Sequence, residues 1–276
     1  MGALHHLGSR ERKTFQPRKW PVFESAPRTS NAKCIASAHD SDNTAPGDSN
    51  LAEESNAFHS LLEHAATYSF LILFATVLYY LLTHLAQQQR LWLIVPAIPL
   101  GLLAGDFVSG LVHWLADTYG SERTPLVGRN FIKWFRRHHL FPQDICAHGF
   151  IATNGNTCIL AVPLTALCLL LIQQEDVSAL RAFAVLVVVL MTVTTVATNQ
   201  FHKWSHDDAP ARLVRWLQRS RIILHPRHHS LHHREPFAIN YCIANGWLNP
   251  LLERVKFFPM LERAMRRLGI KSNRQS

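Results

Sequence analysis

The chain has 276 residues, of which 48% are hydrophobic and 17% are charged, and its formal net charge at pH 7 is +9. This length suits one sizeable domain rather than several. The five cysteines include no CxxC pair, which argues against a disulfide framework. No nucleic acid partner is needed to explain the positive charge, because the lysines and arginines are distributed as in a membrane protein.

The first 60 residues are polar and lack the apolar core of a secretory signal. Their richness in Pro, Ser and Asn is typical of disorder. An early basic bias leaves a targeting peptide as the alternative to a plain tail. We therefore divide the chain into a disordered N-terminal tail, residues 1–60, and a membrane-bound domain, residues 61–276.

Four apolar stretches are each long enough to cross a bilayer, which takes about 20 mostly apolar residues. They cover residues 65–86, 91–115, 157–173 and 180–199. A soluble bundle with apolar core helices is the alternative, but four such stretches in one chain of this length are hard to bury without lipid. The sequence predicts an all-α fold, a four-helix transmembrane bundle with a cytosolic, histidine-rich helical cap.

The basic residues indicate the orientation of this bundle. All but two of the 28 lysines and arginines lie in the tail, in the loop 117–156 or after residue 200, and the two exceptions are Arg90 and Arg181. Four crossings place the three basic regions on one side, which the positive-inside rule makes cytosolic. We expect a multi-pass protein of the endoplasmic reticulum membrane in a eukaryote, or of the cytoplasmic membrane in a bacterium.

Eleven of the 17 histidines lie between His113 and His233, all at cytosolic helix ends or in cytosolic loops. They occur in "GDFVSGLVHWLADTYG", "FRRHHLFPQDICAHGF", "NQFHKWSH" and "HPRHHSLHH". The other six are assigned to ordinary interfacial or tail positions, and they are His5, His6, His39, His59, His64 and His84. The predicted topology therefore brings distant histidine segments to one side of the membrane.

Helical spacing predicts that these histidines converge. His202 and His206 share one face at i and i+4, and His229 and His233 do the same if a helix follows Pro226. In the second apolar stretch a polar stripe faces the bundle rather than lipid. Its members are Asp106, Gly110, His113 and Asp117, and the neighbouring small residues Gly101, Gly105 and Ser109 suit close helix packing.

The convergence predicts a metal site with more than one ion. Imidazole suits zinc, copper, iron and nickel, and one such ion takes at most about six ligands. Adjacent residues on a helix point about 100° apart, so each HH pair serves two neighbouring ions better than one. The predicted ligands are His113, His138, His139, His202, His206, His229, His232 and His233, with Asp117 as a ligand or as an acceptor that orients an imidazole.

Several long blocks resemble the Kua/CarF family of lipid desaturases, whose characterised members are plasmanylethanolamine desaturases. These blocks are "DFVSGLVHWLADTYGSERTPLVGRNFIKWFRRHH", "FIATNGNT", "TNQFHKWSH" and "HHSLHHREPFAINYCIANGWLNPLLE", and the resemblance covers about residues 100–265. The eight histidines match the family's ligand pattern, and Asp117 matches its HxxxD. The resemblance implies that residues 61–276 form a lipid desaturase domain.

The resemblance also implies an activity. Two iron ions and O2 would convert the 1-O-alkyl chain of an ether phospholipid into the vinyl ether of a plasmalogen. Since the chain carries no haem-attachment motif or flavin fingerprint, electrons would come from a donor such as cytochrome b5 or ferredoxin.

Two departures and two alternatives accompany this expectation. Ala152 and Asn156 replace acidic residues of the family's block, and His148, His225 and His228 lie outside the ligand pattern. An acyl-lipid desaturase or hydroxylase on the same scaffold is one alternative. The other is a membrane regulator that binds metal without catalysis.

Overall fold

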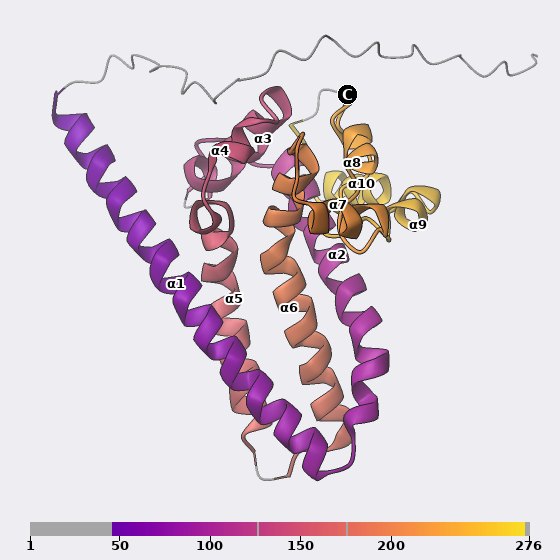
Figure 1. The fold of residues 1–276 in the computed structure, drawn as a ribbon. Coiled ribbons are helices and arrows are strands. Elements are labelled where there is room, and N and C mark those ends of the chain that lie inside the picture. The colour runs from indigo at the N-terminus through magenta and orange to yellow at the C-terminus, as the bar shows by residue number, and fades with distance from the viewer. Residues whose placement is uncertain (1–45, 126, 175, 274–276) are drawn as a thin grey trace, which may run out of the picture. The chain divides into compact units, whose positions relative to one another are not determined.

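The computed structural model describes residues 46–273, apart from 126 and 175, and this part of the chain is helical and contains no β-strand. Four long helices run side by side, and the short helices between residues 128 and 147 and after residue 211 gather at one end of them (Figure 1). The long helices are α1 (Pro46–Gln87), α2 (Ile94–Thr118), α5 (Phe150–Ile172) and α6 (Ala179–His206). The short helices are η1 (Leu91–Leu93), η2 (Gly128–Ile132), α3 (Lys133–Leu140), α4 (Asp144–Ala147), α7 (Arg212–Arg219), α8 (Pro226–His232), α9 (Asn249–Arg254) and α10 (Phe257–Arg267).

Four helical segments are long and apolar enough to cross a membrane, which confirms the predicted all-α fold with four candidate spans. The segments are Ala57–Gln87, Leu91–Thr118, Phe150–Ile172 and Ala179–His206. The third begins earlier than predicted and the fourth ends later. Both differences extend a helix toward the end of the bundle that carries the short helices.

Polar residues do not end α5 where the hydrophobic pattern stops, because their side chains find partners in the bundle. The Asn154 side chain donates to the Phe150 carbonyl at 2.8 Å. The Asn199 side chain of α6 donates to the Thr153 carbonyl at 3.1 Å and to the Thr157 hydroxyl at 3.0 Å. With these side-chain donors satisfied, the helix continues through the "TNGN" stretch.

Small residues set the closest contact between two long helices, α2 and α6. A Cβ atom added to Gly101 would lie 2.3 Å from the Leu190 Cβ, and one added to Gly105 would lie 2.6 Å from the Thr194 Cβ. No such contact is tolerated between real side chains, so the two glycines allow the backbones to approach. The close contact fixes α6 against α2.

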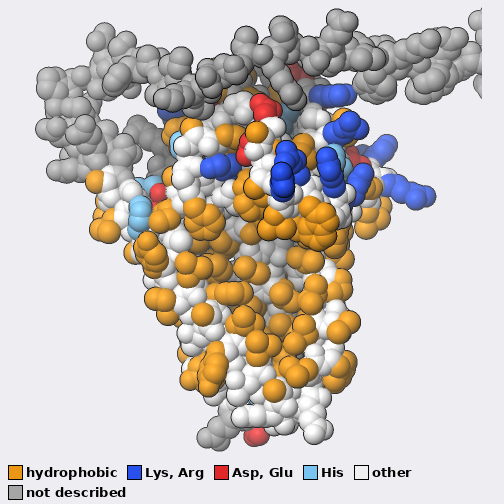
Figure 2. Space-filling model, viewed as in Figure 1, with side chains coloured by type: hydrophobic (Ala, Val, Ile, Leu, Met, Phe, Trp, Pro, Cys, Tyr) orange, Lys and Arg blue, Asp and Glu red, His pale blue; other side chains and the backbone are white. Residues whose placement is uncertain are grey.

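The surface of the bundle is apolar. Figure 2 shows hydrophobic side chains covering the long helices, with lysines and arginines concentrated near the end that carries the short helices. Val95 is 75% exposed and Leu160 is 73% exposed. An apolar belt of this extent is unfavourable in water and is expected where lipid surrounds the helices.

The predicted tail, residues 1–60, lies mostly outside the described residues. Its part up to residue 45 is outside them, and residues 46–60 belong to α1. The side of the membrane on which the short helices lie stays a prediction from the basic residues.

Candidate metal centre

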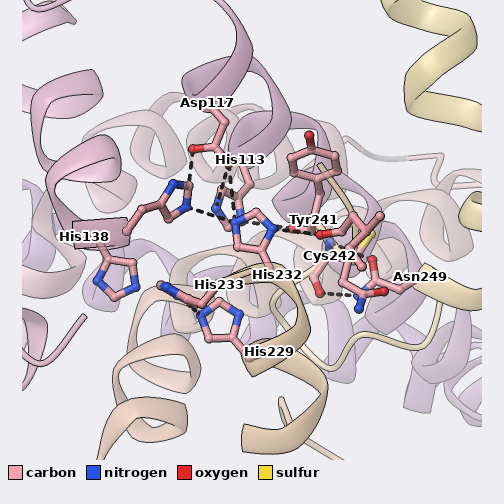
Figure 3. Close-up of polar contacts among 12 residues, drawn as sticks. His113, Asp117, His138, His229, His232, His233, Tyr241, Cys242 and Asn249 are labelled. Carbon is pink, nitrogen blue, oxygen red and sulfur yellow. Dashed lines mark hydrogen bonds and ion pairs between the residues drawn. The ribbon is translucent and has the colours of Figure 1, made fainter. Parts of the chain in front are cut away.

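All nine predicted site residues lie close together at the end of the bundle that carries α3 and α8. Figure 3 labels six of them, which are His113, Asp117, His138, His229, His232 and His233. They form two groups, and within each group one ligand atom per residue lies within 4.8 Å of the others. The five-histidine group consists of His138, His202, His206, His229 and His233. The aspartate group consists of His113, Asp117, His139 and His232.

The two adjacent histidine pairs are divided between the groups. His138 of α3 belongs to the five-histidine group, whereas its neighbour His139 belongs to the aspartate group. His232 and His233 are divided in the same way at the end of α8. The predicted helix after Pro226 is present, and its geometry turns successive side chains toward different groups.

The ring nitrogens of the five-histidine group lie so close together that hydrogen bonds between the rings cannot pair all of them. The Nε2 atom of His206 lies 2.9 Å from that of His138 and 2.9 Å from that of His229. The His229 Nε2 atom also lies 2.9 Å from the His233 Nε2 atom. Each such nitrogen offers either one proton or one lone pair, so His206 and His229 satisfy only one of their two neighbours each. A cation that accepts all the lone pairs removes this conflict.

The aspartate group places a carboxylate among three imidazoles. Asp117 Oδ2 lies 3.4 Å from the Nε2 atoms of both His113 and His232, and Asp117 Oδ1 lies 3.7 Å from His139 Nε2. The Asp117 side chain is 3% exposed, and among the described residues neither of its oxygens has a hydrogen bond. Buried carboxylates are normally hydrogen-bonded, paired or bound to metal.

The donor set of both groups fits first-row transition metals. The 2.9 Å and 3.0 Å separations of ring nitrogens match the spacing expected for ligands at right angles around one ion, because bonds of about 2.1 Å place such nitrogens about 3 Å apart. Some buried atoms of these groups, including His113 Nε2 and His202 Nε2, have no hydrogen bond among the described residues, which also favours a bound metal. The assignment of these residues as ligands stays a prediction.

Backbone carbonyls orient two rings of the aspartate group. The Nδ1 atom of His113 lies 3.2 Å from the Tyr241 carbonyl, and that of His232 lies 2.8 Å from the Ile239 carbonyl. A carbonyl only accepts, so both Nδ1 atoms carry the proton and both Nε2 lone pairs face the group. The sequence pattern did not reveal these carbonyls, because any residue type supplies one.

Asp106 holds the loop that carries these carbonyls. Its Oδ1 atom accepts the backbone N–H groups of Asn245 and Gly246 at 3.0 and 2.9 Å, and its Oδ2 atom accepts that of Leu248 at 3.1 Å. A Cβ added to Gly110, one turn further along α2, would lie 2.5 Å from the Cys242 sulfur. The predicted polar stripe of α2 therefore packs against this loop, and Asp106 supports the site from outside.

Burial and mutual repulsion favour the neutral form of three imidazoles outside the helical spans, those of His138, His229 and His233. Burial, followed by the neighbouring His206 and His233, lowers the pKa of His138 to about 2. Burial and His206 lower the pKa of His233 to about 3, and the pKa of His229 is lowered for the same two reasons. Neutral rings offer the lone pairs that a metal needs.

The three histidines outside the ligand pattern lie outside both groups. His225 caps α8, with its Nδ1 atom accepting the Arg227 N–H at 3.2 Å. The Nε2 atom of His228 lies 2.9 Å from the side-chain nitrogen of Asn249. His148 lines a cavity beside the five-histidine group.

The cavity beside the five-histidine group has a volume of about 320 Å³ and is the larger of two cavities at the site. It reaches His138 and His202 of the five-histidine group. Its wall is partly apolar, with Phe131, Trp134, Phe135, Ile145 and Ala152, and partly polar, with His59, Glu63, Arg137, Asp144 and Asn156. Sequence reasoning missed His59 and Glu63, since both precede the apolar stretch 65–86 and His59 falls in the predicted tail. The two departures from the family block, at 152 and 156, both face this cavity.

A second, smaller cavity of about 250 Å³ reaches the other group. Its lining includes Asp117 and His139, and the ring of Phe237 stacks on that of His139 with centroids 4.6 Å apart. Each of the two groups therefore borders its own cavity.

Comparison with known proteins identifies the family. Residues 102–275 match the model of the lipid desaturase domain. A plasmanylethanolamine desaturase of Myxococcus xanthus is 43% identical over 204 residues, which cover 73% of this chain and 70% of the relative. Plasmanylethanolamine desaturase 1 of Mus musculus is 41% identical over 191 residues, which cover 66% of this chain and 69% of the relative.

A more distant relative is the chloroplastic fatty acid desaturase 4 of Arabidopsis thaliana, 34% identical over 164 residues, which cover 59% of this chain and 48% of the relative. No solved structure matches the chain. The chain therefore belongs to the lipid desaturase family, and it is an oxidoreductase of the desaturase class.

Proposed function

We propose that the protein is an O2-dependent di-iron desaturase that introduces the vinyl-ether double bond into the 1-O-alkyl chain of plasmanylethanolamine, a step of plasmalogen synthesis. The observation that carries this proposal is the pair of adjoining ligand groups, one of which borders a cavity with a polar wall. The names of the bacterial and mouse relatives support the substrate.

The five-histidine group and the aspartate group would each hold one iron ion. When bound, the iron would activate O2 and remove an unactivated hydrogen, which no side chain does alone. Burial keeps His138 neutral, the Tyr241 and Ile239 carbonyls orient the rings of His113 and His232, and Asp117 adds a carboxylate to the centre.

The position of the larger cavity favours a reaction close to the lipid headgroup. In a 1-O-alkyl lipid the bond to be desaturated joins the first two chain carbons, which are separated from the glycerol by the ether oxygen only. A desaturase that acts in the middle of an acyl chain needs a long apolar channel between the headgroup and the metal. Here charged side chains such as Glu63 and Arg137 line the same cavity as the predicted ligands His138 and His202.

The setting of the reaction follows from the charge distribution. We place the short helices and the metal centre on the cytosolic side, because the basic residues accumulate there. An ether phospholipid would enter from the membrane, and cytochrome b5 or ferredoxin would supply electrons from the cytosol. Residues 61–276 would form the desaturase domain.

Expression of the full chain in a host that makes no plasmalogens, fed an alkyl ether lipid, tests the proposal. Mass spectrometry should detect the acid-labile vinyl ether with the wild type and with His225→Ala, and not with His202→Ala. A new double bond elsewhere in the lipid would favour an acyl-lipid desaturase. Folded, iron-loaded protein that leaves all lipids unchanged would favour a regulator.

A further inference from the structure

Helix α1 contributes to the larger cavity although it precedes residues 102–275, the part matched by the family model. Its side chains His59 and Glu63 face the same space as His138 and His202. The cavity thus has one wall built from the predicted metal ligands and another built by a helix outside the matched domain. Such a wall is well placed to select among substrates.

Glu63 is positioned by its neighbours on α5. A Cβ added to Gly155 would lie 2.6 Å from the Glu63 Cβ, so the glycine allows Glu63 to approach α5 closely. The Asn156 side chain donates to Glu63 Oε1 at 3.0 Å, and His59 Nε2 lies 3.4 Å from the same oxygen. These contacts hold the carboxyl group in one orientation at the cavity wall.

The charge of Glu63 calls for a further partner. The residue is 9% exposed and lies in a helix apolar enough to cross a membrane, where an ionisable side chain is costly. Among the described side chains its ion-pair partner is His59, and no lysine or arginine is paired with it. A cationic ligand group in the cavity would compensate the carboxylate.

On this basis we infer that Glu63 binds the ammonium group of the substrate headgroup and selects ethanolamine lipids over choline lipids. The inference rests on the proposed function, in which the headgroup of the reacting lipid lies near the metal centre. A primary ammonium donates hydrogen bonds to a carboxylate, whereas the trimethylammonium of choline has no N–H to donate. Arg137, whose side chain is 47% exposed and pairs with Asp144 at 3.2 Å, lines the same cavity.

Glu63→Gln separates charge from structure. Glutamine keeps the volume and an oxygen that accepts from Asn156, so a purely structural link between α1 and α5 survives this substitution. The full chain is assayed in host membranes with plasmanylethanolamine and with plasmanylcholine. Gln87→Ala, an exposed change at the far end of the same helix, is the control.

We expect the wild type and Gln87→Ala to prefer the ethanolamine lipid. In Glu63→Gln the KM for that lipid rises about tenfold, as expected for a lost charged hydrogen bond, while kcat stays unchanged. The KM for the choline lipid rises less, because choline loses only the charge attraction and no hydrogen bond. Glu63→Asp restores part of the preference. Asn156→Ala, which frees the carboxylate without removing it, gives an intermediate preference and serves as the test if Glu63→Gln does not fold.

An unchanged headgroup preference in Glu63→Gln or Asn156→Ala overturns the inference, as does an equal loss of activity toward both lipids. A wild type that desaturates alkyl ether lipids without headgroup preference overturns it too. By contrast, a wild type that is folded and loaded with iron but acts on neither lipid overturns the proposed function itself, so the two failures are distinguishable.

Discussion

The five-histidine group and the aspartate group lie side by side and yet differ in charge, in support and in access. The first consists of neutral rings, whereas the second contains the Asp117 carboxylate. Backbone carbonyls fix two rings of the second, while the Nδ1 atoms of His229 and His233 in the first have no hydrogen bond among the described residues. The larger cavity reaches the first group and the smaller one reaches the second.

These differences indicate that the two metal positions differ in metal affinity and in their distance from the substrate cavity. A negative ligand and preoriented rings favour tight binding, so the aspartate group should retain its ion more strongly. The five-histidine group has less support from outside, and it borders the space in which we place the substrate.

Replacing Asp117 should have the largest effect. Asp117→Ala removes the only negative charge of the centre, and we expect desaturation to fall at least about 100-fold with loss of one of the two ions. His206→Ala leaves four histidines in its group and should lower metal affinity less. Activity and metal content of the two purified variants give the comparison, and equal metal loss in both would argue against a difference between the groups.

Asp106→Asn should weaken the aspartate group from a distance. The new amide nitrogen would face the Leu248 N–H, so one donor of the loop loses its acceptor and the Tyr241 carbonyl shifts relative to His113. We expect metal affinity at this group to fall about 10- to 100-fold. Competition with a chelator measures it, and Asp144→Asn, which changes an exposed carboxylate, should leave it unaltered. Unaltered affinity in Asp106→Asn would contradict the support role.

Acid should destabilise the metal-free protein through the five-histidine group. His138 and His233 have pKa values of about 2 and about 3 in the folded chain, against the ordinary 6.5. The unfolded chain therefore binds more protons below pH 6.5, so the free energy of unfolding falls as the pH drops from 6.5 toward 3. Thermal melting at pH 7.5 and 5.5 should show the loss, and His138→Ala/His233→Ala should reduce it. A metal-free protein that melts at the same temperature at both pH values would contradict this prediction.

The smallest effects are expected at the histidines outside both groups. His225→Ala removes a cap of α8 and should cost about 1 kcal/mol of stability, with activity within about twofold of the wild type. His228→Ala removes the contact with Asn249 and should behave similarly. The melting temperature and the desaturation rate of each variant check these expectations. Loss of activity in a folded variant would show that the replaced histidine belongs to the site.

The sequence predicted the long helices and the convergence of the histidines well, because both depend on periodic patterns. The i, i+4 spacing of His202 and His206 and the helix after Pro226 are local properties that a helix must express. The division of His138 from His139 between the groups follows from the same helical geometry.

Other features depend on contacts between distant segments and were not predictable from local patterns. The role of Asp106 required the loop 241–249 to fold back against α2, and Glu63, which precedes the predicted span 65–86, has its distant partner Asn156 on α5. Helix α5 begins at Phe150 because Asn199 of α6 satisfies its polar start. Partners of this kind are separated by tens of residues in the chain and appear only in the folded structure.

The iron content of the purified wild type decides whether the two groups form a di-iron centre. We expect two iron ions per chain in protein that forms the vinyl ether, and about one in the double variant Asp117→Ala/His232→Ala, which keeps the five-histidine group intact. One ion per chain in the active wild type, or zinc in place of iron, would contradict a di-iron centre divided between the two groups.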